Sequence, residues 1–210
     1  MRVLSKEQTN QKLCTLKTAA ADLFSSIGYH AVSLRDLAKE INLSPGAIYN
    51  HIDSKQDLLF TLTDESFNQR IHLLTQEISH SVNNGSSALD AITQGFITHS
   101  SNGKLGIALA MRELSSFNPS QRSEIQRLIN IENSIIAQSL ATEFNIDLSA
   151  EPLLTEAART LTELMDGYFF AQQLNVSKNP TFLFSAIRAS ATTLLTTLLK
   201  EKIASAITSH

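Results

Sequence analysis

Residues 33–59 are the segment of this sequence whose residue types and spacing best indicate a functional site. They read SLRDLAKEINLSPGAIYNHIDSKQDLL, a pattern of two short helical pieces around a tight turn, followed by the start of a third helix. In a helix-turn-helix, the second short helix presents polar side chains and its N-terminal amides to the major groove of DNA. The chemistry that this segment predicts is therefore noncovalent recognition of DNA.

Helix start signals divide the segment. Ser33 is a good N-cap, and Asp36 follows three residues later, as in a capping box with a shortened carboxylate. Ser44 caps the second piece, and Pro45 occupies its first turn, where the missing N–H costs nothing. Asn42 lies where the chain must turn, and Asn tolerates the left-handed conformation better than most residues.

An apolar seam is expected to hold the two short helices at a fixed angle. Ala38 and Gly46 are small residues where the two backbones approach each other. Before the segment, apolar residues at spacings of three and four predict a helix that ends at Gly28. The seam residues are Leu37, Ala38, Ile41, Leu43 and Ile48.

Helical periodicity dominates the rest of the chain, without a convincing alternating strand. Ser54 and Asp57 give a third start signal, which opens a long helical pattern that the sequence NNGSS breaks at residues 83–87. We predict an all-α fold of about nine helices, with a three-helix helix-turn-helix domain at residues 1–55 and a larger helical domain at 56–210. The further helices are expected near 87–100, 104–116, 120–144, 151–174 and 181–204.

The charge of the chain is unevenly distributed. The formal net charge is −3, which does not favour a nucleic-acid binder, but residues 1–55 hold seven Lys/Arg against five Asp/Glu. A mildly basic module on an acidic body is compatible with local phosphate binding. The single cysteine, Cys14, is interpreted as a small core residue of a cytoplasmic protein. The N-terminus lacks the apolar run of a signal peptide, and no stretch predicts a membrane span.

The helix-turn-helix segment resembles the DNA-binding domain of the TetR (tetracycline repressor) family. The matching motifs are SLRDLA at 33–38, SPGAIYNHI at 44–52 and SKQDL at 54–58, and the resemblance covers roughly residues 10–60. Three positions depart from the family pattern without removing a DNA-facing group: Asn42 replaces a glycine, Ile52 a phenylalanine, and Asp53 a proline or basic residue. The preceding helix matches at Ala20, Leu23, Phe24, Gly28 and Tyr29.

The resemblance implies roles for individual residues. Tyr49 and His51 would lie along the phosphate backbone, and Lys55, with the free amides of its helix, would meet a phosphate. Ser33 and Ser54 are assigned mainly to capping, with phosphate contact secondary. Candidates for base edges or the groove floor are Arg35, Ser44, Pro45, Gly46 and Asn50.

Taken singly, three of these residues have ordinary structural alternatives. Tyr49 can be a partly buried helix aromatic. Arg35 can be a solvated residue paired with Glu40, and Lys55 a surface lysine. Only the joint pattern favours DNA binding.

The larger domain is expected to bind a small-molecule effector, apolar or acyl-like. MREL at 111–114 and NPSQR at 118–122 resemble a C-terminal domain type of the family, some members of which respond to acyl-coenzyme A. His99 and Arg112 are the best polar anchors, although core packing is the alternative for each candidate. The candidate lining residues are Phe96, His99, Met111, Arg112, Phe117, Gln138, Met165, Tyr168 and Phe169.

The last two helices are expected to form a homodimer interface, because two recognition helices must meet successive major grooves. The first stripe consists of Leu153, Leu154, Ala157, Ala158, Leu161, Leu164, Met165 and Tyr168. The second consists of Phe184, Ile187, Ala191, Leu194, Leu195 and Leu198, with small residues at 186, 189, 190, 193 and 197. An ordinary intramolecular core is the alternative for part of both stripes.

We therefore expect a transcriptional regulator, a repressor released from double-stranded operator DNA by an effector. One alternative is a DNA-binding factor of the same fold without an effector, and another is an all-helical enzyme. The sequence has no phosphate loop, His-Glu-x-x-His motif or nucleophile elbow, and His72 and His80 are about two turns apart, too far to share a metal alone. We expect no enzyme activity, metal or cofactor.

Overall fold

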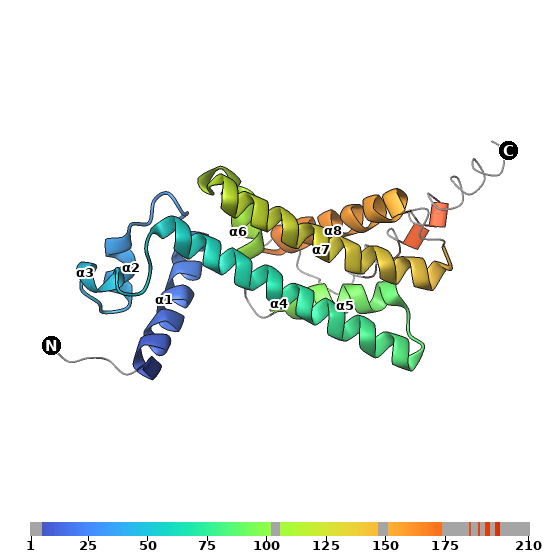
Figure 1. Ribbon diagram of the computed structural model, residues 1–210, viewed down its shortest axis with the longest axis horizontal. Helices are drawn as coiled ribbons and strands as arrows, with labels where there is room; N and C mark the ends of the chain where they lie inside the picture. The colour runs from blue at the N-terminus through green and yellow to red at the C-terminus, as the bar shows by residue number, and fades with distance from the viewer. Residues whose placement is uncertain are drawn as a thin grey trace. The chain divides into compact units, whose positions relative to one another are not determined.

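The computed structural model describes residues 6–101, 106–146 and 151–173, and single positions at 185, 189, 192, 193, 196 and 197. Within these residues the chain forms eight α-helices and one short 3-10 helix, and no strand occurs among them (Figure 1). The predicted all-α class is confirmed. None of the described helices is long and apolar enough to cross a membrane.

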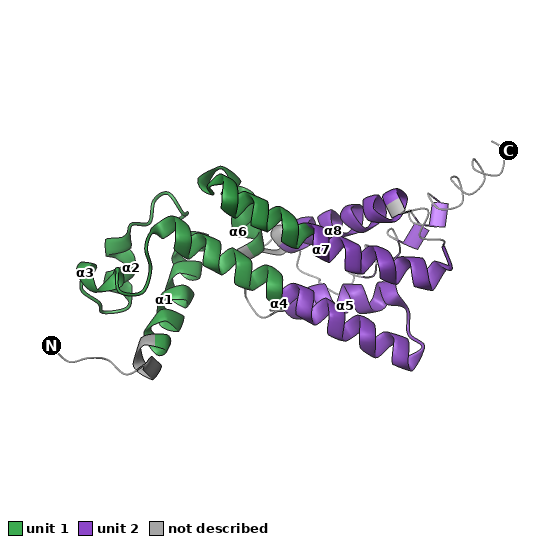
Figure 2. Cartoon of the chain, viewed as in Figure 1, with its two compact units in different colours: residues 1–69, 102–129 green, residues 70–101, 130–210 purple. Residues whose placement is uncertain are grey.

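The chain divides into two compact units, which Figure 2 shows in green and purple. The first comprises residues 1–69 and 102–129, and the second residues 70–101 and 130–210. Two helices contribute to both units: α4 (Lys55–Asn84) and α7 (Pro119–Phe144). Residue 55, where the sequence analysis places the domain boundary, is the first residue of α4.

The first unit contains the predicted helix-turn-helix. Its elements besides the first parts of α4 and α7 are α1 (Lys6–Ser26), α2 (Leu34–Glu40), α3 (Pro45–Ile48), α6 (Gly106–Arg112) and the 3-10 helix η1 (Leu114–Ser116). The core side chains at spacings of three and four on α1 meet those of α2, α3 and α4. They are Leu16, Ala20, Phe24, Leu37, Ala38, Ile48, Leu58 and Leu59, each fully buried.

The second unit is a separate helical core. It contains α5 (Ala88–Ser101), α8 (Glu151–Gln173) and the later parts of α4 and α7. Its buried apolar residues are Leu74, Leu89, Ile92, Phe96, Ile136, Ala137, Leu140, Ala141, Leu154, Ala157, Ala158, Leu161 and Met165. Gly95 on α5 is required there, because a Cβ would lie 2.8 Å from Leu74 Cδ2 and 3.2 Å from its Cα.

Most predicted helix ends agree with the structure, and two interpretations need correction. The stretch predicted as one helix at 104–116 is α6 followed by η1, because Glu113 leaves the helical conformation (φ −106°, ψ 24°). Cys14 is exposed rather than buried. It lies two residues before Leu16, about 200° around the helix, and so falls on the opposite face. The helix predicted at 181–204 lies mostly outside the described residues, as do Phe184, Ile187, Ala191, Leu194, Leu195 and Leu198.

Candidate nucleic-acid interface

The predicted capping box fixes the start of α2. Asp36 N donates to Ser33 Oγ at 3.2 Å, and Ser33 N donates to Asp36 Oδ2 at 2.8 Å. The hydroxyl of Ser33 also donates to Asp36 Oδ2, at 2.5 Å. These bonds favour the charged carboxylate, so the side-chain hydrogen bond of Ser33, followed by its backbone N–H, lowers the pKa of Asp36. The shortened box is therefore a complete one.

The turn between α2 and α3 uses the predicted left-handed residue. Asn42 has a φ of 54°, and Leu43 N donates to Ala38 O at 2.8 Å, which closes the helix end. Ser44 then caps α3, because its Oγ accepts from Ala47 N at 3.3 Å, with Pro45 in the first turn. Ile48 is fully buried, so α3 is fixed against α2 by its one inward side chain.

With that seam buried, polar and small groups remain on the outside of the two short helices. Tyr49 leaves 60% of its surface exposed, a large fraction for an aromatic residue. Gly46 has open space where a Cβ would lie, so its backbone is accessible. Seven of the nine predicted DNA-contacting residues are exposed: Ser33, Arg35, Ser44, Pro45, Gly46, Tyr49 and Asn50.

Lys55 is half-buried and has protein partners of its own. Its Nζ donates to Tyr29 O at 2.9 Å and to Val32 O at 2.8 Å, and it lies 4.4 Å from the centroid of the Tyr29 ring. A lysine ammonium has three N–H groups, so these bonds leave one. The side chain fastens the start of α4 to the loop between α1 and α2.

His51 is also half-buried. Its Nδ1 is buried and has no hydrogen-bond partner among the described residues. Only Nε2 of this ring is therefore available for the predicted phosphate contact.

A polar cluster that the sequence analysis did not anticipate joins the starts of α4 and α7. Gln121 Nε2 donates to Asp57 Oδ1 at 3.0 Å, and Gln56 Nε2 donates to Gln121 Oε1 at 2.7 Å. Asp57 Oδ2 also accepts from Ser54 Oγ at 2.6 Å. The sequence feature that could have indicated this cluster is Asn118, an N-cap residue at the start of α7. Its Oδ1 accepts a hydrogen bond from Gln121 N at 2.9 Å. The cluster ties the first turn of α4 to a second helix.

The comparison with protein families matches this part of the chain. Residues 16–62, which run from the middle of α1 into α4, match the model described as bacterial regulatory proteins, tetR family. The resemblance of this region to the TetR family is confirmed. The match contains all nine predicted DNA-contacting residues.

Solved structures extend the likeness beyond the matched residues. The TetR-family regulator PfmR from Thermus thermophilus is 19% identical, with a TM-score of 0.65, over 84% of this chain and 94% of that one. The fatty acid degradation regulator FadR from Bacillus halodurans is 17% identical, with a TM-score of 0.67, over 90% and 96%.

A third similar structure contains ligands. AibR in complex with isovaleryl coenzyme A and operator DNA is 16% identical, with a TM-score of 0.61, over 75% of this chain and 85% of that one. At these identities the likenesses show the TetR-family fold of both units and no more.

The residues predicted to line an effector site are divided between the two units. Three lie in the first unit: Met111 is 57% exposed, Arg112 donates to Phe24 O at 3.5 Å, and Phe117 is buried against Phe60. In the second unit Gln138 is exposed. The other five there are buried or partly buried: Phe96, His99, Met165, Tyr168 and Phe169.

The second unit also contains a buried ion cluster that the sequence did not predict. Arg70 donates through Nε and Nη2 to the two carboxylate oxygens of Glu132, at 2.5 and 2.6 Å, and through Nη1 to Asp166 Oδ1 at 2.5 Å. Its guanidinium lies 4.7 Å from the centroid of the Phe96 ring. Burial opposes the charge of Arg70, but the two carboxylates outweigh it and raise its pKa. The cluster joins α4, α7 and α8.

Proposed function

We propose that this TetR-family regulator is a repressor that binds operator DNA through residues 33–55 and is released by a small-molecule effector. The observation that supports this most strongly is the row of exposed residues at 33, 35, 44–46, 49 and 50, which lie on α2 and α3 and beside their ends, within the matched family domain. A buried seam fixes the two short helices that carry the row. The proposed site of action is the cytoplasm, where the DNA lies, and no catalytic role is proposed.

Each exposed residue is assigned the contact that its chemistry suits. Tyr49 and His51 Nε2 would donate to phosphates, and the remaining N–H of Lys55 would join them. Arg35 can bind guanine through two hydrogen bonds, and Asn50 can bind adenine. Ser33 is already occupied by Asp36, so its contribution is mainly to position α2.

The operator-binding form is proposed to be a homodimer. Two copies of α3 about 34 Å apart would reach successive major grooves on one side of the duplex. On α8, most residues of the predicted stripe are buried in the second unit's own core, but Leu164 is 42% exposed. An exposed leucine on that helix is suited to a contact with a second copy.

Release by an effector requires that ligand binding change the free energy of the DNA-binding form. Both α4 and α7 contribute to the second unit and to the first, and the first turn of α4 carries Lys55 and Asp57. An effector that binds one arrangement of these helices more tightly shifts the population toward it.

Replacing Arg35 tests the role of the row. We expect Arg35→Met to lose about 1–3 kcal/mol of preference for operator over scrambled DNA, if Arg35 reads a base. Fluorescence anisotropy with both duplexes measures this, and Arg159→Met is the control because Arg159 is an exposed arginine of α8 paired with Glu156. Equal losses in the two variants would contradict the assignment.

A further inference from the structure

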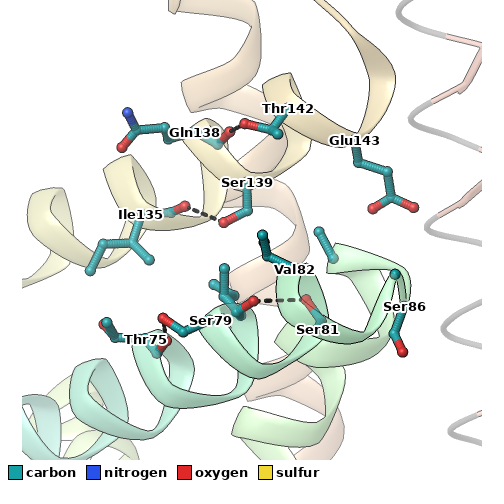
Figure 3. A pocket seen from close by; sticks show the side chains of 13 residues that line it. Thr75, Ser79, Ser81, Val82, Ser86, Ile135, Gln138, Ser139, Thr142 and Glu143 are labelled. Carbon is teal, nitrogen blue, oxygen red and sulfur yellow. Dashed lines mark hydrogen bonds between the residues drawn. The ribbon is translucent and has the colours of Figure 1, made fainter.

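The second unit has a cavity of about 680 Å³ between α4, the turn after it, and α7. Besides Ser81, four α4 residues line it at spacings of three and four: Thr75, Ile78, Ser79 and Val82. Ile135, Gln138, Ser139 and Thr142 repeat the same spacing on α7. Figure 3 shows these two helix faces opposite each other across the hollow. Because small hydroxyl residues occupy positions where leucines would fill the space, the faces leave room for a ligand.

The hydroxyl groups of these walls present oxygen lone pairs rather than hydrogens. Ser79 Oγ donates to Thr75 O at 2.7 Å, Ser139 Oγ to Ile135 O at 2.9 Å, and Thr142 Oγ1 to Gln138 O at 2.9 Å. Thr75 and Ser81 likewise donate to carbonyls of α4. A hydroxyl has one hydrogen, so a group that uses it within its own helix can only accept from a ligand. These five hydroxyl groups therefore suit N–H or O–H donors of a ligand, and the side-chain amide of Gln138 can both donate and accept.

The charge around the cavity is negative. Glu143 is the one charged residue among the described lining residues. Its Oε1 accepts from Ser87 Oγ at 2.8 Å and its Oε2 from Leu89 N at 3.2 Å, which leaves further lone pairs for a ligand.

The unit as a whole shares that sign. Its described stretches, residues 70–101, 130–146 and 151–173, hold two Lys/Arg against eight Asp/Glu. The remaining residues of the unit add four Lys/Arg and two Asp/Glu, so the acidic excess persists. One of the two described arginines, Arg70, is held by Glu132 and Asp166. A cationic ligand is favoured by this field, and the phosphates of a coenzyme A thioester would meet no cation among the described lining residues.

The cavity also has an apolar part. Val82 is 67% exposed, and Ile78, Ala88 and Ile135 lie among the same lining residues. Exposed aliphatic groups beside acceptor oxygens match a molecule with a hydrocarbon portion and a donor head group.

We propose that this cavity binds a protonated organic amine with an apolar portion, and that such an ammonium compound is the effector of the regulator. The ammonium N–H groups donate to the hydroxyl oxygens and to Glu143, and the hydrocarbon portion covers Val82 and the two isoleucines. The binding site is independent of the proposed function, whereas the effector role rests on it. This ligand class differs from the acyl-like effector expected from the sequence.

The test uses three probes of equal chain length: octylamine, octanol and octanoate. Calorimetry with the full chain in the absence of DNA is expected to show octylamine binding at one site per chain, more tightly than the other two. We expect Ser139→Leu, and separately Ser79→Leu, to weaken octylamine binding on the order of tenfold, because the leucine fills space that buried methylenes of the ligand need. Ser134→Leu is the matched control, since Ser134 is an exposed α7 residue that does not line the cavity. Thermal melts establish that each variant is folded.

The role of the negative charge of Glu143 is tested by Glu143→Gln, which keeps a side-chain oxygen that can accept from Leu89 N of α5. It is expected to weaken octylamine binding several-fold and to leave octanol binding unchanged. Tighter binding of octanoate than of octylamine, or octylamine affinity unchanged in both leucine variants, overturns the proposed site.

DNA titrations without and with octylamine separate this inference from the proposed function. Operator discrimination by a protein that does not bind octylamine overturns the inference alone. Octylamine binding without any DNA binding overturns the proposed function and the effector role together. Octylamine binding that leaves operator affinity unchanged overturns the effector role.

Discussion

The two units differ in how far their charged residues are buried. In the first, Arg35 is exposed and Lys55 is half-buried against two backbone carbonyls. In the second, Arg70 and Glu132 are almost completely removed from water. Exposed cations remain available for a partner that binds and dissociates, whereas a buried ion pair fixes its helices and is costly to break. The comparison supports the proposal that exposed charge in the first unit is available for recognition, whereas the buried ion pairs of the second unit hold its helices in position.

The largest effect is expected at the buried cluster. Arg70→Met leaves Glu132 buried without its partner, and we expect a loss of about 3–5 kcal/mol in the free energy of unfolding. Urea denaturation measures it, with Arg159→Met as the surface control, which should change little because Arg159 and Glu156 are solvated. Adding Glu132→Leu to Arg70→Met is expected to recover much of the loss. A small effect of Arg70→Met alone would remove the contrast between the units.

An intermediate effect on stability is expected at Lys55, which both holds the start of α4 in position and is proposed to contact a phosphate. Lys55→Met leaves the carbonyls of Tyr29 and Val32 without this donor, so the free energy of unfolding should fall by about 1–3 kcal/mol. Chemical denaturation and DNA anisotropy are measured on the same sample. Unchanged stability with weakened DNA binding would assign Lys55 to phosphate contact alone.

Capping gives a smaller effect. Ser33→Ala removes the hydroxyl of a complete capping box and should cost about 1 kcal/mol in the free energy of unfolding. Ser44→Ala removes one bond of 3.3 Å on a four-residue helix, so its loss should be less. Thermal melts of both variants check this order, which would be contradicted by a larger loss for Ser44→Ala.

The smallest effect concerns pH. Because the pKa of Asp36 is lowered in the folded protein, its contribution to stability is present above its unfolded-state pKa and is lost as pH falls through its lower folded-state pKa. Asp36→Asn should therefore be less stable than wild type at neutral pH, and the difference should shrink in acid. Denaturation at several pH values measures it, and a difference that grows in acid would contradict the account.

Local signals allowed the helix starts and the turn of the helix-turn-helix to be predicted, although α3 ends at Ile48 and not beyond His51 as the pattern predicted. Ser33, Asn42 and Ser44 act on backbone groups a few positions away, so their effect is visible in the sequence itself. On α1, Leu16, Ala20 and Phe24 are buried. Cys14 on the same helix is exposed and Ile27, directly after the helix, is 60% exposed, because apolar character alone does not define the angle around a helix.

Contacts between distant residues could not be predicted in the same way. Arg70 meets Glu132 and Asp166, which are 62 and 96 residues away. Gln121 meets Asp57 across 64 residues. The nine predicted effector-site residues were chosen by type, and their separation between two units depends on packing that no local pattern records.

Titration of DNA from the upstream region of the protein's own gene tests the central claim most directly. The DNA is labelled for fluorescence anisotropy, compared with a scrambled duplex of equal length, and measured at two salt concentrations. We predict tighter binding to the upstream duplex, saturating at two or four chains per site, and with Tyr49→Ala a similar loss of affinity for both duplexes, because a phosphate contact carries no sequence information. No binding to either duplex by the folded, dimeric protein would contradict the account.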